Sequence, residues 1–342
     1  MSLNSKNSEY TIVGAGLAGT VLAWQFLKRN IPFSLIDAGE NQSTTTAAGV
    51  VNPIVFKRLT KSWKADDLLP YAGEFYTELE DKLGVELLLR KNLLRIFASV
   101  EEENNWSVKE GDDRFTTYLD RPDNLEITGV NQQYGAGLVK TIGHLKTTIF
   151  LEESHRYFQS LGYLVEKRSF DYDEVDANKQ YIFCEGVAVQ NNPYFTFLPL
   201  KPTHGEVLII RSTTLKVNHI VNRNMFIQPL GNDLFKLGAT YNWELNEPIC
   251  TEEGKADLLE RFEQFVDCEY EVVDQLAGIR PTVKDRRPLI GSHPQKENLH
   301  VFNGMGTKGV MIAPFFANQF ADALLGVAPL DKEVDIRRFW TE

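Results

Sequence analysis

The chain has 342 residues, which exceeds what one hydrophobic core usually supports, so two domains are expected. Its composition, with 43% hydrophobic and 24% charged residues, is that of an ordinary globular protein. The formal net charge of -11 at pH 7 argues against a large phosphate-binding surface, because nucleic-acid affinity depends mainly on clustered lysine and arginine. We therefore expect no nucleic-acid partner.

The cysteines and histidines predict neither a disulfide framework nor a metal site. The three cysteines, Cys184, Cys250 and Cys268, are scattered without a Cys-x-x-Cys spacing, which favours unpaired thiols in a reducing, cytoplasmic compartment. The six histidines show no metal-ligand spacing. The N-terminus lacks the apolar core of a secretory signal. Polar interruptions in the apolar stretch 309–330 favour a buried loop and core helix over a membrane span.

The first forty residues have the pattern of a strand, a helix and a second strand. A short β-branched run over 10–16 ends in glycines, which predicts a buried strand entering a tight turn. Apolar residues recur at helical spacing over 17–29, and Asn30 is a plausible stop. Residues 33–37 predict another buried strand. The three segments form a βαβ unit of about the length that a parallel crossover needs.

The rest of the chain alternates between helical and strand-like patterns. Further helices are predicted over 65–83, 145–161, 252–267 and near 314–325. Strands are predicted over 163–168, over 181–184 and within 205–241, where Gly231-Asn232-Asp233 is a hairpin turn. Residues 85–140 are predicted to hold short strands and polar turns.

This interleaving predicts an α/β nucleotide-binding domain that is discontinuous along the chain. We assign it residues 1–75, 139–195 and 278–342. An α+β substrate domain with an antiparallel sheet is inserted in two pieces, 76–138 and 196–277.

The motif Gly14-x-Gly16-x-x-Gly19 is the first chemical signal. Its glycines permit a tight turn, a close backbone approach to a pyrophosphate, and close packing of the helix on the strand. Amide groups at the helix start then face the phosphates. Asp37, 18 residues after Gly19, ends the next strand, where its carboxylate can accept hydrogen bonds from both ribose hydroxyls. The motif predicts dinucleotide binding, and the acid disfavours NADP because it would repel a 2′-phosphate.

Three later segments complete the pattern. Small residues over 44–53 can lie flat against a bulky planar ring. The segment 278–291 contains Arg280 and Pro281, and the segment 303–310 is a second glycine-rich turn before a helix. The amides of that turn suit a developing negative charge, such as the pyrimidine edge of a reduced flavin.

Taken in order, the four segments resemble the D-amino-acid oxidase family of FAD enzymes, and are most similar to its glycine oxidase and sarcosine oxidase branch. The similarity is strong over 10–56 and 278–325, moderate over 139–245 and weak over 57–138. It implies a two-dinucleotide-binding, Rossmann-like fold and an FAD-dependent oxidoreductase whose flavin ring lies between the two domains. No cysteine lies near the position where sarcosine oxidases attach their flavin, so noncovalent FAD is expected.

The resemblance also implies roles for individual residues. The cofactor-binding set is Gly14, Gly16, Leu17, Ala18, Gly19, Asp37, Ala38, Thr45, Thr46, Ala47, Ala48, Gly49, Val50, Glu185, Gly186, Gly304, Met305, Gly306, Thr307, Lys308, Gly309 and Val310. Arg280 and Lys308 are the candidate catalytic residues. Arg280 occupies the position from which family members clamp a substrate carboxylate, and Lys308 would stabilise reduced flavin. A guanidinium suits a carboxylate because its fork donates two parallel hydrogen bonds.

Two positions depart from the family pattern. Phe226 stands where glycine oxidase-like enzymes carry a carboxylate-binding tyrosine, and Thr307 stands where some carry a second arginine. These changes favour a substrate other than glycine. His204 and Tyr241 are each candidates either for the pocket wall or for a structural role.

The expected reaction is oxidation of a C–N bond in a small amine or amino acid by hydride transfer to flavin N5, which gives an imine that hydrolyses. The electron acceptor is oxygen or another carrier. One alternative is oxidative cleavage of a modified wobble-uridine side chain, because the 202–207 and C-terminal glycine segments also resemble the oxidase domain of the tRNA methylaminomethyl-thiouridine enzyme. A second is a flavin-containing structural or partner-binding module without a substrate.

Overall fold

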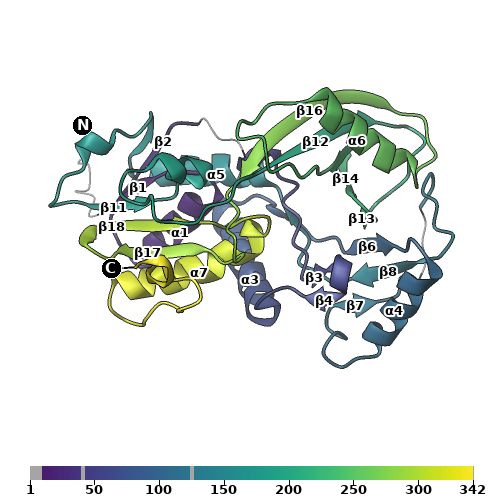
Figure 1. The fold of residues 1–342 in the computed structure, drawn as a ribbon, viewed down its shortest axis with the longest axis horizontal. Helices are drawn as coiled ribbons and strands as arrows, with labels where there is room; N and C mark the ends of the chain where they lie inside the picture. The colour runs from purple at the N-terminus through teal and green to yellow at the C-terminus, as the bar shows by residue number, and fades with distance from the viewer. Residues whose placement is uncertain (1–9, 40–42, 124–126, 342) are drawn as a thin grey trace.

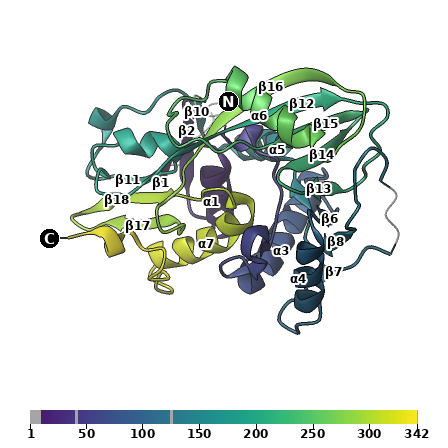
Figure 2. The same cartoon turned by 45° about the vertical axis from the view of Figure 1, so that its right-hand side comes forward.

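The computed structural model describes residues 10–39, 43–123 and 127–341. Within these residues, two large sheets lie toward opposite ends of the molecule (Figure 1). One has six strands in the order β10-β2-β1-β11-β18-β17, and the other has eight in the order β16-β12-β15-β14-β13-β6-β8-β7. The second view shows the helices α1, α7 and α3 between the six-stranded sheet and the strands β6 to β8 (Figure 2).

The six-stranded sheet is the nucleotide-binding type. Its strands are β1 (Tyr10–Val13), β2 (Phe33–Asp37), β10 (Val165–Lys167), β11 (Gln180–Phe183), β17 (Leu289–His293) and β18 (Lys296–Asn303). Neighbouring strands run parallel, except that β17 is antiparallel to β18. Side chains alternate across it, so Ile182 of β11 joins the helical core while Phe183 joins the core on the opposite face.

Helices cover one face of this sheet and share one hydrophobic core with it. They are α1 (Leu17–Lys28), α3 (Ala65–Leu83), α5 (Thr147–Ser160) and α7 (Gly309–Leu324). Trp24 and Phe316 are fully buried in this core. The Trp24 indole N–H donates to Ser154 Oγ at 2.9 Å, which satisfies its polar atom inside the core. Burial on this scale fixes α1 and therefore the glycine turn that precedes it.

The eight-stranded sheet is antiparallel except where β13 and β6 run parallel. Its strands are β6 (Leu93–Ile96), β7 (Leu119–Asp120), β8 (Ala136–Val139), β12 (Thr203–Arg211), β13 (Ile220–Asn222), β14 (Phe226–Gly231), β15 (Leu234–Gly238) and β16 (Glu271–Arg280). The helix α6 (Glu252–Glu263) packs behind it, where Phe262 and Leu208 share a second core. The opposite face carries Gly205, Val207 and Gly238.

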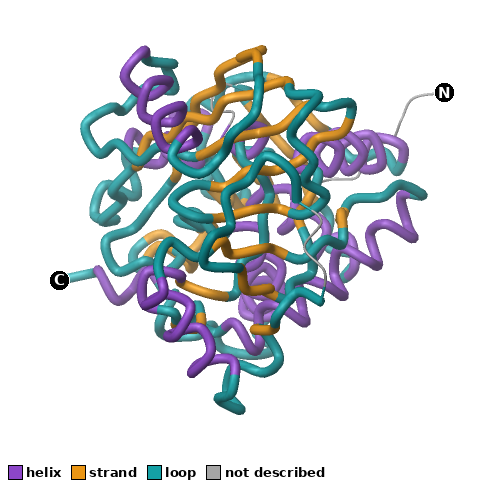
Figure 3. The backbone as a smooth tube through the Cα atoms, turned by 90° about the vertical axis from the view of Figure 1, so that its right-hand side faces the viewer, coloured by secondary structure: helices purple, strands orange, loops and turns teal. Residues whose placement is uncertain are grey.

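Smaller elements lie around the two sheets. They are α2 (Ser43–Thr46), α4 (Val100–Glu110), the pair β3 (Ile54–Val55) and β4 (Thr60–Lys61), and the pair β5 (Leu88–Leu89) and β9 (His144–Leu145). Short 3-10 helices cover Phe56–Arg58, Tyr172–Glu174, Gly186–Asn191 and Ile336–Phe339. Viewed from the end that carries the eight-stranded sheet, strands cross the middle of the molecule and helices lie toward its outside (Figure 3).

The predicted elements with strong local signals are confirmed. The βαβ unit, the helix over 65–83 and the strands over 205–241 are present. The Gly231-Asn232-Asp233 turn joins β14 to β15, and Asn232 and Asp233 have φ of 52° and 57°, as such a tight hairpin requires. The helix predicted over 252–267 ends earlier, at Glu263.

The prediction that 85–140 holds only strands and turns is wrong, because α4 spans Val100–Glu110. Trp106 is its only buried residue, while Val100 and Val108 are exposed, so no apolar stripe marks the helix. The sequence signal for α4 lies instead in the polar residues at its start. Ser99 caps the helix by accepting a hydrogen bond from the Glu102 N–H, and three glutamates fill the first turn.

The last helix begins at Gly309, earlier than the predicted 314, and therefore contains Pro314. A proline inside a helix removes the hydrogen bond to the carbonyl four residues before it, here that of Val310. The Tyr76 hydroxyl donates to this carbonyl at 3.0 Å. The freed acceptor is thus satisfied by a neighbouring helix, which sequence reasoning about Pro314 could not reveal.

The division into two domains stays a prediction. Three of its borders fall inside regular elements: 75/76 lies within α3, 138/139 within β8 and 277/278 within β16. We place these borders at the ends of the elements instead, because a helix that packs into one core as a unit belongs to one domain. Among the described residues, no helix combines the length and apolarity needed to cross a bilayer.

Candidate active site

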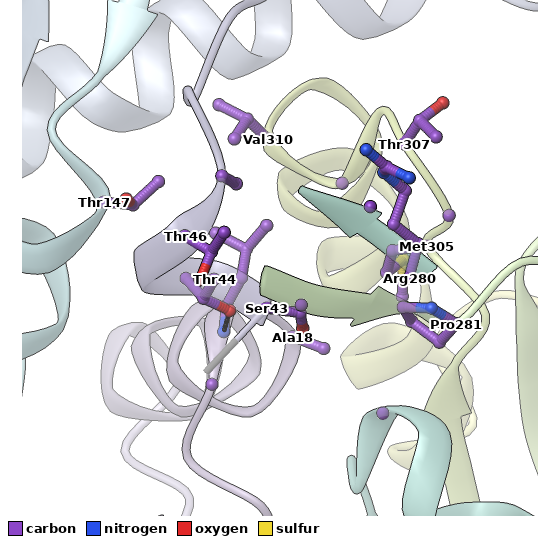
Figure 4. A pocket seen from close by; sticks show the side chains of 18 of the residues that line it. Ala18, Ser43, Thr44, Thr46, Thr147, Arg280, Pro281, Met305, Thr307 and Val310 are labelled. Carbon is purple, nitrogen blue, oxygen red and sulfur yellow. Dashed lines mark hydrogen bonds between the residues drawn. The ribbon is translucent and has the colours of Figure 1, made fainter. Parts of the chain in front are cut away.

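A cavity of about 680 Å³ lies between the two sheets. Its walls come from the turn after β1, the end of β2, the segment 43–50, the turn after β11, the cavity face of the eight-stranded sheet and the turn before α7. The close-up shows Thr44 and Thr46 on one wall and Arg280, Met305 and Thr307 on the facing wall (Figure 4). This volume lies within the range of about 300–1,000 Å³ typical of ligand and cofactor sites.

The glycine turn after β1 brings backbone within reach of a ligand. Gly14 has φ of +97°, and a Cβ there would lie 2.5 Å from the Cys184 carbonyl oxygen. A Cβ on Gly19 would lie 1.9 Å from the Gly14 oxygen, so only glycine lets α1 approach β1 this closely. The turn is further held by Asp37, whose Oδ1 accepts from the Ala15 N–H at 3.0 Å.

The start of α1 suits a phosphate group. Its first turn contains no acidic residue, and its macrodipole favours negative charge at this end. The Leu17 N–H donates to Thr44 Oγ1 at 3.2 Å. The segment after β2 therefore closes over the amides of the glycine turn.

The turn after β11 holds a buried carboxyl group. Glu185 Oε1 accepts from the Tyr172 hydroxyl at 2.7 Å, and Oε2 accepts from Asn192 Nδ2 at 3.0 Å. Burial raises the pKa of Glu185, and these two hydrogen bonds oppose the shift. The following residue, Gly186, has its carbonyl held by Asn303 Nδ2 at 2.9 Å, which ties this turn to the end of β18.

Hydrogen bonds from the eight-stranded sheet hold the small-residue segment 43–50. Thr46 Oγ1 donates to the Ala277 carbonyl at 3.2 Å, and Lys236 Nζ donates to the Thr46 carbonyl at 3.2 Å. Gly49 has φ of +66°, and a Cβ there would lie 2.1 Å from the Leu145 oxygen. The segment is therefore a fixed wall of the cavity.

Arg280 is the last residue of β16 and lines the cavity. Its Nη1 donates to the carbonyls of His204 and Thr240, both at 3.3 Å, and its guanidinium lies 4.4 Å from the centroid of the Tyr241 ring. Among the described residues no carboxylate pairs with it, and burial lowers its pKa. Gly205 provides the space, since a Cβ there would lie 2.2 Å from Nη1.

Lys308 is held by the protein itself. Its Nζ donates to the Asn52 carbonyl at 2.6 Å and to Ser62 Oγ at 2.6 Å, and it precedes α7 as its N-cap. Desolvation lowers the pKa of Lys308 to about 8. Two of its three donors are thus committed to fixing 52–62 against the start of α7, which leaves one for a ligand.

The lowered pKa of Lys308 predicts a pH-dependent contribution to stability. Between about pH 8 and the ordinary lysine value of 10.5, the unfolded chain holds a proton that the folded chain has released, so the free energy of unfolding rises with pH. We expect the stability of the wild type relative to Lys308→Met to rise by about 2–3 kcal/mol across this window. Urea unfolding of both proteins from pH 7 to pH 10.5 measures the difference. If the difference in free energy of unfolding between the two proteins does not change with pH, the pKa of Lys308 is not lowered in the folded protein.

Most of the predicted site residues come together at the cavity. Those that line it are Gly14, Gly16, Leu17, Ala18, Asp37, Ala38, Thr46, Ala47, Ala48, Gly49, Val50, Glu185, Gly186, Arg280, Met305, Gly306, Thr307, Lys308, Gly309 and Val310. Gly19, Thr45 and Gly304 are not among the lining residues. Gly19 packs behind the turn, and Gly304 is buried beside Val283 and Leu289.

Tyr241 and His204, each a candidate for the pocket wall or for a structural role, lie in different places. Tyr241 lines the cavity, as does Phe226. His204 is fully buried on the opposite face of β12, where Nε2 lies 2.8 Å from the Ile249 carbonyl. Its neighbour Glu206 accepts from Thr251 N at 2.9 Å and from Thr251 Oγ1 at 2.8 Å. His204 therefore has a structural role behind the sheet.

Sequence reasoning named Arg280 and Phe226 but missed the rest of the wall formed by the eight-stranded sheet. It includes Gly205, Val207, Asn222, Gly238 and Gly278. The signal that could have found it is the recurrence of glycine inside strands, which marks places where another group approaches the backbone closely.

The comparison with known families decides the identity of the fold. Residues 9–323 match the DAO family, described as FAD dependent oxidoreductase. The chain belongs to this family. The predicted fold class and family resemblance are thereby confirmed, and the protein is an FAD-dependent oxidoreductase.

Individual relatives agree in overall length but are distant in sequence. Glycine oxidase of Geobacillus kaustophilus is 22% identical over 357 residues, covering 92% of each protein. Its crystal structure superimposes with a TM-score of 0.77 at 17% identity, covering 97% of each chain. L-Amino acid deaminase from Proteus myxofaciens superimposes with a TM-score of 0.78 at 12% identity, covering 100% of this chain and 95% of the other. At such identities the structures show a shared fold.

The cavity fits FAD. Gly14 and Gly16 line the cavity without side chains, so their backbone is open to a ligand. The helices that begin at the cavity, α1 and α7, carry no acid in their first turns. These features suit the pyrophosphate and a negatively charged ring edge. Asp37 stands at the end of β2, where a ribose is bound in this type of fold.

Proposed function

We propose that the protein oxidises a C–N bond in a small amine that carries a carboxylate. The observation that supports this most is Arg280, a partly buried cation on the cavity wall that no carboxylate of the described residues neutralises. An unpaired charge withdrawn from water is costly, so such a site favours an anionic ligand. Two relatives of the same fold are described as glycine oxidase and as iminodiacetate oxidase from Chelativorans, whose names denote carboxylated amines.

Nη1 of Arg280 already donates to two backbone carbonyls. In this proposal the remaining N–H groups of Arg280 donate to the substrate carboxylate. FAD, when bound, supplies the hydride acceptor for the carbon next to nitrogen. The acidic side chains among the lining residues are Asp37 and Glu185, which belong to the turns after β2 and β11. Among the described residues that line the cavity beside Arg280, there is no carboxylate or imidazole to accept a proton, so the amine arrives without its proton in this proposal. The imine product then hydrolyses in water.

The substrate differs from glycine in this proposal. Phe226 lines the cavity where a tyrosine would donate a hydrogen bond to a carboxylate, and its ring lies against Gly238, where a Cβ would be 2.8 Å from the Phe226 Cζ. Thr307 is exposed and short. The cavity is also lined by Arg168 and Arg261, but acidic side chains pair with both. Among the described residues, Arg280 is therefore the lining guanidinium left for a substrate carboxylate, and Phe226 adds apolar surface to the cavity.

The second candidate reaction acts on a modified uridine in tRNA. Its support is similarity to the tRNA 5-methylaminomethyl-2-thiouridine biosynthesis bifunctional protein of Legionella pneumophila, 24% identical over 307 residues. The match covers 83% of this chain and only 45% of that protein. The net charge of -11 also disfavours an RNA surface.

Anaerobic reduction of the flavin tests the proposal. The purified holoenzyme is mixed, without oxygen, with carboxylated amines, with the same amines lacking the carboxylate, and with tRNA. The proposal predicts that a carboxylated amine bleaches the visible absorption of the flavin fastest. Bleaching by tRNA, with none by any amine, would favour the second candidate. The rate at which the reduced flavin reoxidises in air then distinguishes oxygen from another electron acceptor.

Asp37→Ala is expected to weaken FAD binding by about 1–3 kcal/mol, because charge-assisted hydrogen bonds to the ribose are lost together with the Ala15 N–H contact. The measurement is a titration of the flavin-free protein with FAD, followed by flavin fluorescence. Asp113→Ala, an exposed acid after α4, is the matched control and should bind FAD as the wild type does. Equal affinities for the wild type and Asp37→Ala would show that Asp37 does not bind the ribose.

A further inference from the structure

Two large aromatic side chains stand in solvent beside Arg280. Tyr241 is 58% exposed and Trp243 is 52% exposed. The segment that carries them is fixed by backbone pairing with the start of β12, where the His204 N–H donates to the Asn242 carbonyl at 2.9 Å and the Asn242 N–H donates back at 3.1 Å. The pairing of Asn242 with His204 therefore anchors the backbone between the two rings to the sheet.

The rings of Tyr241 and Trp243 extend the side of the cavity that carries Arg280 toward the solvent. Tyr241 and Trp243 flank Asn242, which pairs with His204 as in a strand, and in such backbone the residues on either side of a paired residue face the same side. The Arg280 guanidinium lies 4.4 Å from the Tyr241 centroid, and Lys201 Nζ lies 5.1 Å from the Trp243 centroid. Lys201 is held beside the Arg280 strand because its N–H donates to the Thr282 carbonyl at 2.7 Å. The result is a row of two cation–aromatic pairs that begins at the cavity, since Tyr241 lines it.

We propose that Tyr241 and Trp243 form an aromatic subsite, and that the substrate is a carboxylated amine bearing a flat aromatic substituent. This rests on the proposed function and names its substrate class. The carboxylate occupies Arg280, and the substituent extends along the rings that lead out of the cavity. A cation on one side of each aromatic ring leaves ring surface open for stacking, which adds to the area that the ligand buries.

The continuity of the rings with the cavity favours a substrate group over a partner protein. Tyr241 contacts the same guanidinium that receives the carboxylate, so a ligand on Arg280 lies beside the subsite. Phe226 adds apolar surface within the cavity itself. An exposed apolar surface that is continuous with a ligand cavity is typical of a binding groove.

The test uses the holoenzyme and ligands that cannot be oxidised as amines. Phenoxyacetate and methoxyacetate both carry the carboxylate, and only the first has a flat ring; cyclohexyloxyacetate matches its size without being flat. Binding is followed by the change in the visible spectrum of the oxidised flavin. The wild type should bind phenoxyacetate about three- to tenfold more tightly than either of the other two.

Variants assign the preference to the rings. Trp243→Ala should lose most of the preference for phenoxyacetate while binding methoxyacetate as before, and Trp243→Phe should recover part of it. Val273→Ala, which trims a 45% exposed side chain seven residues from Arg280 along β16, is the matched control and should change neither. Equal binding of the three ligands by the wild type, or an unchanged preference in Trp243→Ala, would overturn the aromatic subsite.

Two outcomes separate this proposal from the proposed function. If no amine bleaches the flavin but Trp243→Ala still loses the preference for phenoxyacetate, amine oxidation fails and the subsite stands. If Trp243→Ala changes the oligomeric state in gel filtration and leaves the preference intact, the ring covers a second copy of the chain and the subsite is wrong.

Discussion

Arg280→Ala is expected to lower kcat/KM for a carboxylated amine by roughly 30- to 5,000-fold, which corresponds to about 2–5 kcal/mol. The loss is large because the guanidinium is partly buried and has no carboxylate partner among the described residues, so the substrate supplies its counter-charge. FAD should stay bound, since Arg280 contributes to the substrate end of the cavity. Stopped-flow reduction of the flavin by a range of substrate concentrations measures the effect.

Three controls make the Arg280 result specific. Arg280→Lys should recover only part of the rate, because an ammonium cannot reproduce the two-pronged fork. Arg211→Ala removes an exposed arginine from the far end of the paired strand β12 and should leave the kinetics unchanged. The amine that lacks a carboxylate should lose little. If both amines lose equally, Arg280 serves the fold or the flavin and does not bind the carboxylate.

Gly19→Ala is expected to strip the protein of most of its flavin and to lower its free energy of unfolding by about 1–3 kcal/mol or more. The added Cβ would lie 1.9 Å from the Gly14 carbonyl oxygen, and because this neighbour is backbone, α1 must move away from β1. That movement displaces the amides that face the pyrophosphate. Flavin content after purification and urea unfolding measure the two effects.

Gly111→Ala is the matched control for this substitution. Gly111 follows α4 with φ of -78°, and a Cβ there would meet nothing closer than the Ser107 oxygen at 3.7 Å. This variant should keep both flavin and stability. Full flavin content in Gly19→Ala would contradict the view that close packing of α1 on β1 forms the cofactor site.

The parts of the fold that sequence reasoning reached are those that local rules determine. The glycine turn follows from backbone geometry at Gly14 and Gly19, and Asp37 follows from the length of one crossover. The sequence predicts a helix over 65–83 with the bounds of α3, because Leu68, Phe75 and Leu79 recur on its buried face.

The parts that it did not reach depend on contacts distant in sequence. The start of α7 depends on the Tyr76 hydroxyl, which satisfies the Val310 carbonyl that Pro314 leaves free. The sequence predicts Lys308 at the flavin, whereas its hydrogen bonds to Asn52 and Ser62, some 250 residues away in the chain, are visible only in the structure. The placement of Tyr241 over Arg280 likewise requires the pairing of two strands.

A single anaerobic turnover tests the central claim most directly. Holoenzyme is mixed with an equimolar carboxylated amine, and three quantities are measured in the same sample: flavin reduced, amine consumed and carbonyl compound formed. The account predicts one carbonyl compound and one released amine or ammonia for each flavin reduced, as oxidation of a C–N bond followed by hydrolysis requires. Reduced flavin without a carbonyl product, or oxidised flavin after exposure to every carboxylated amine, would contradict it.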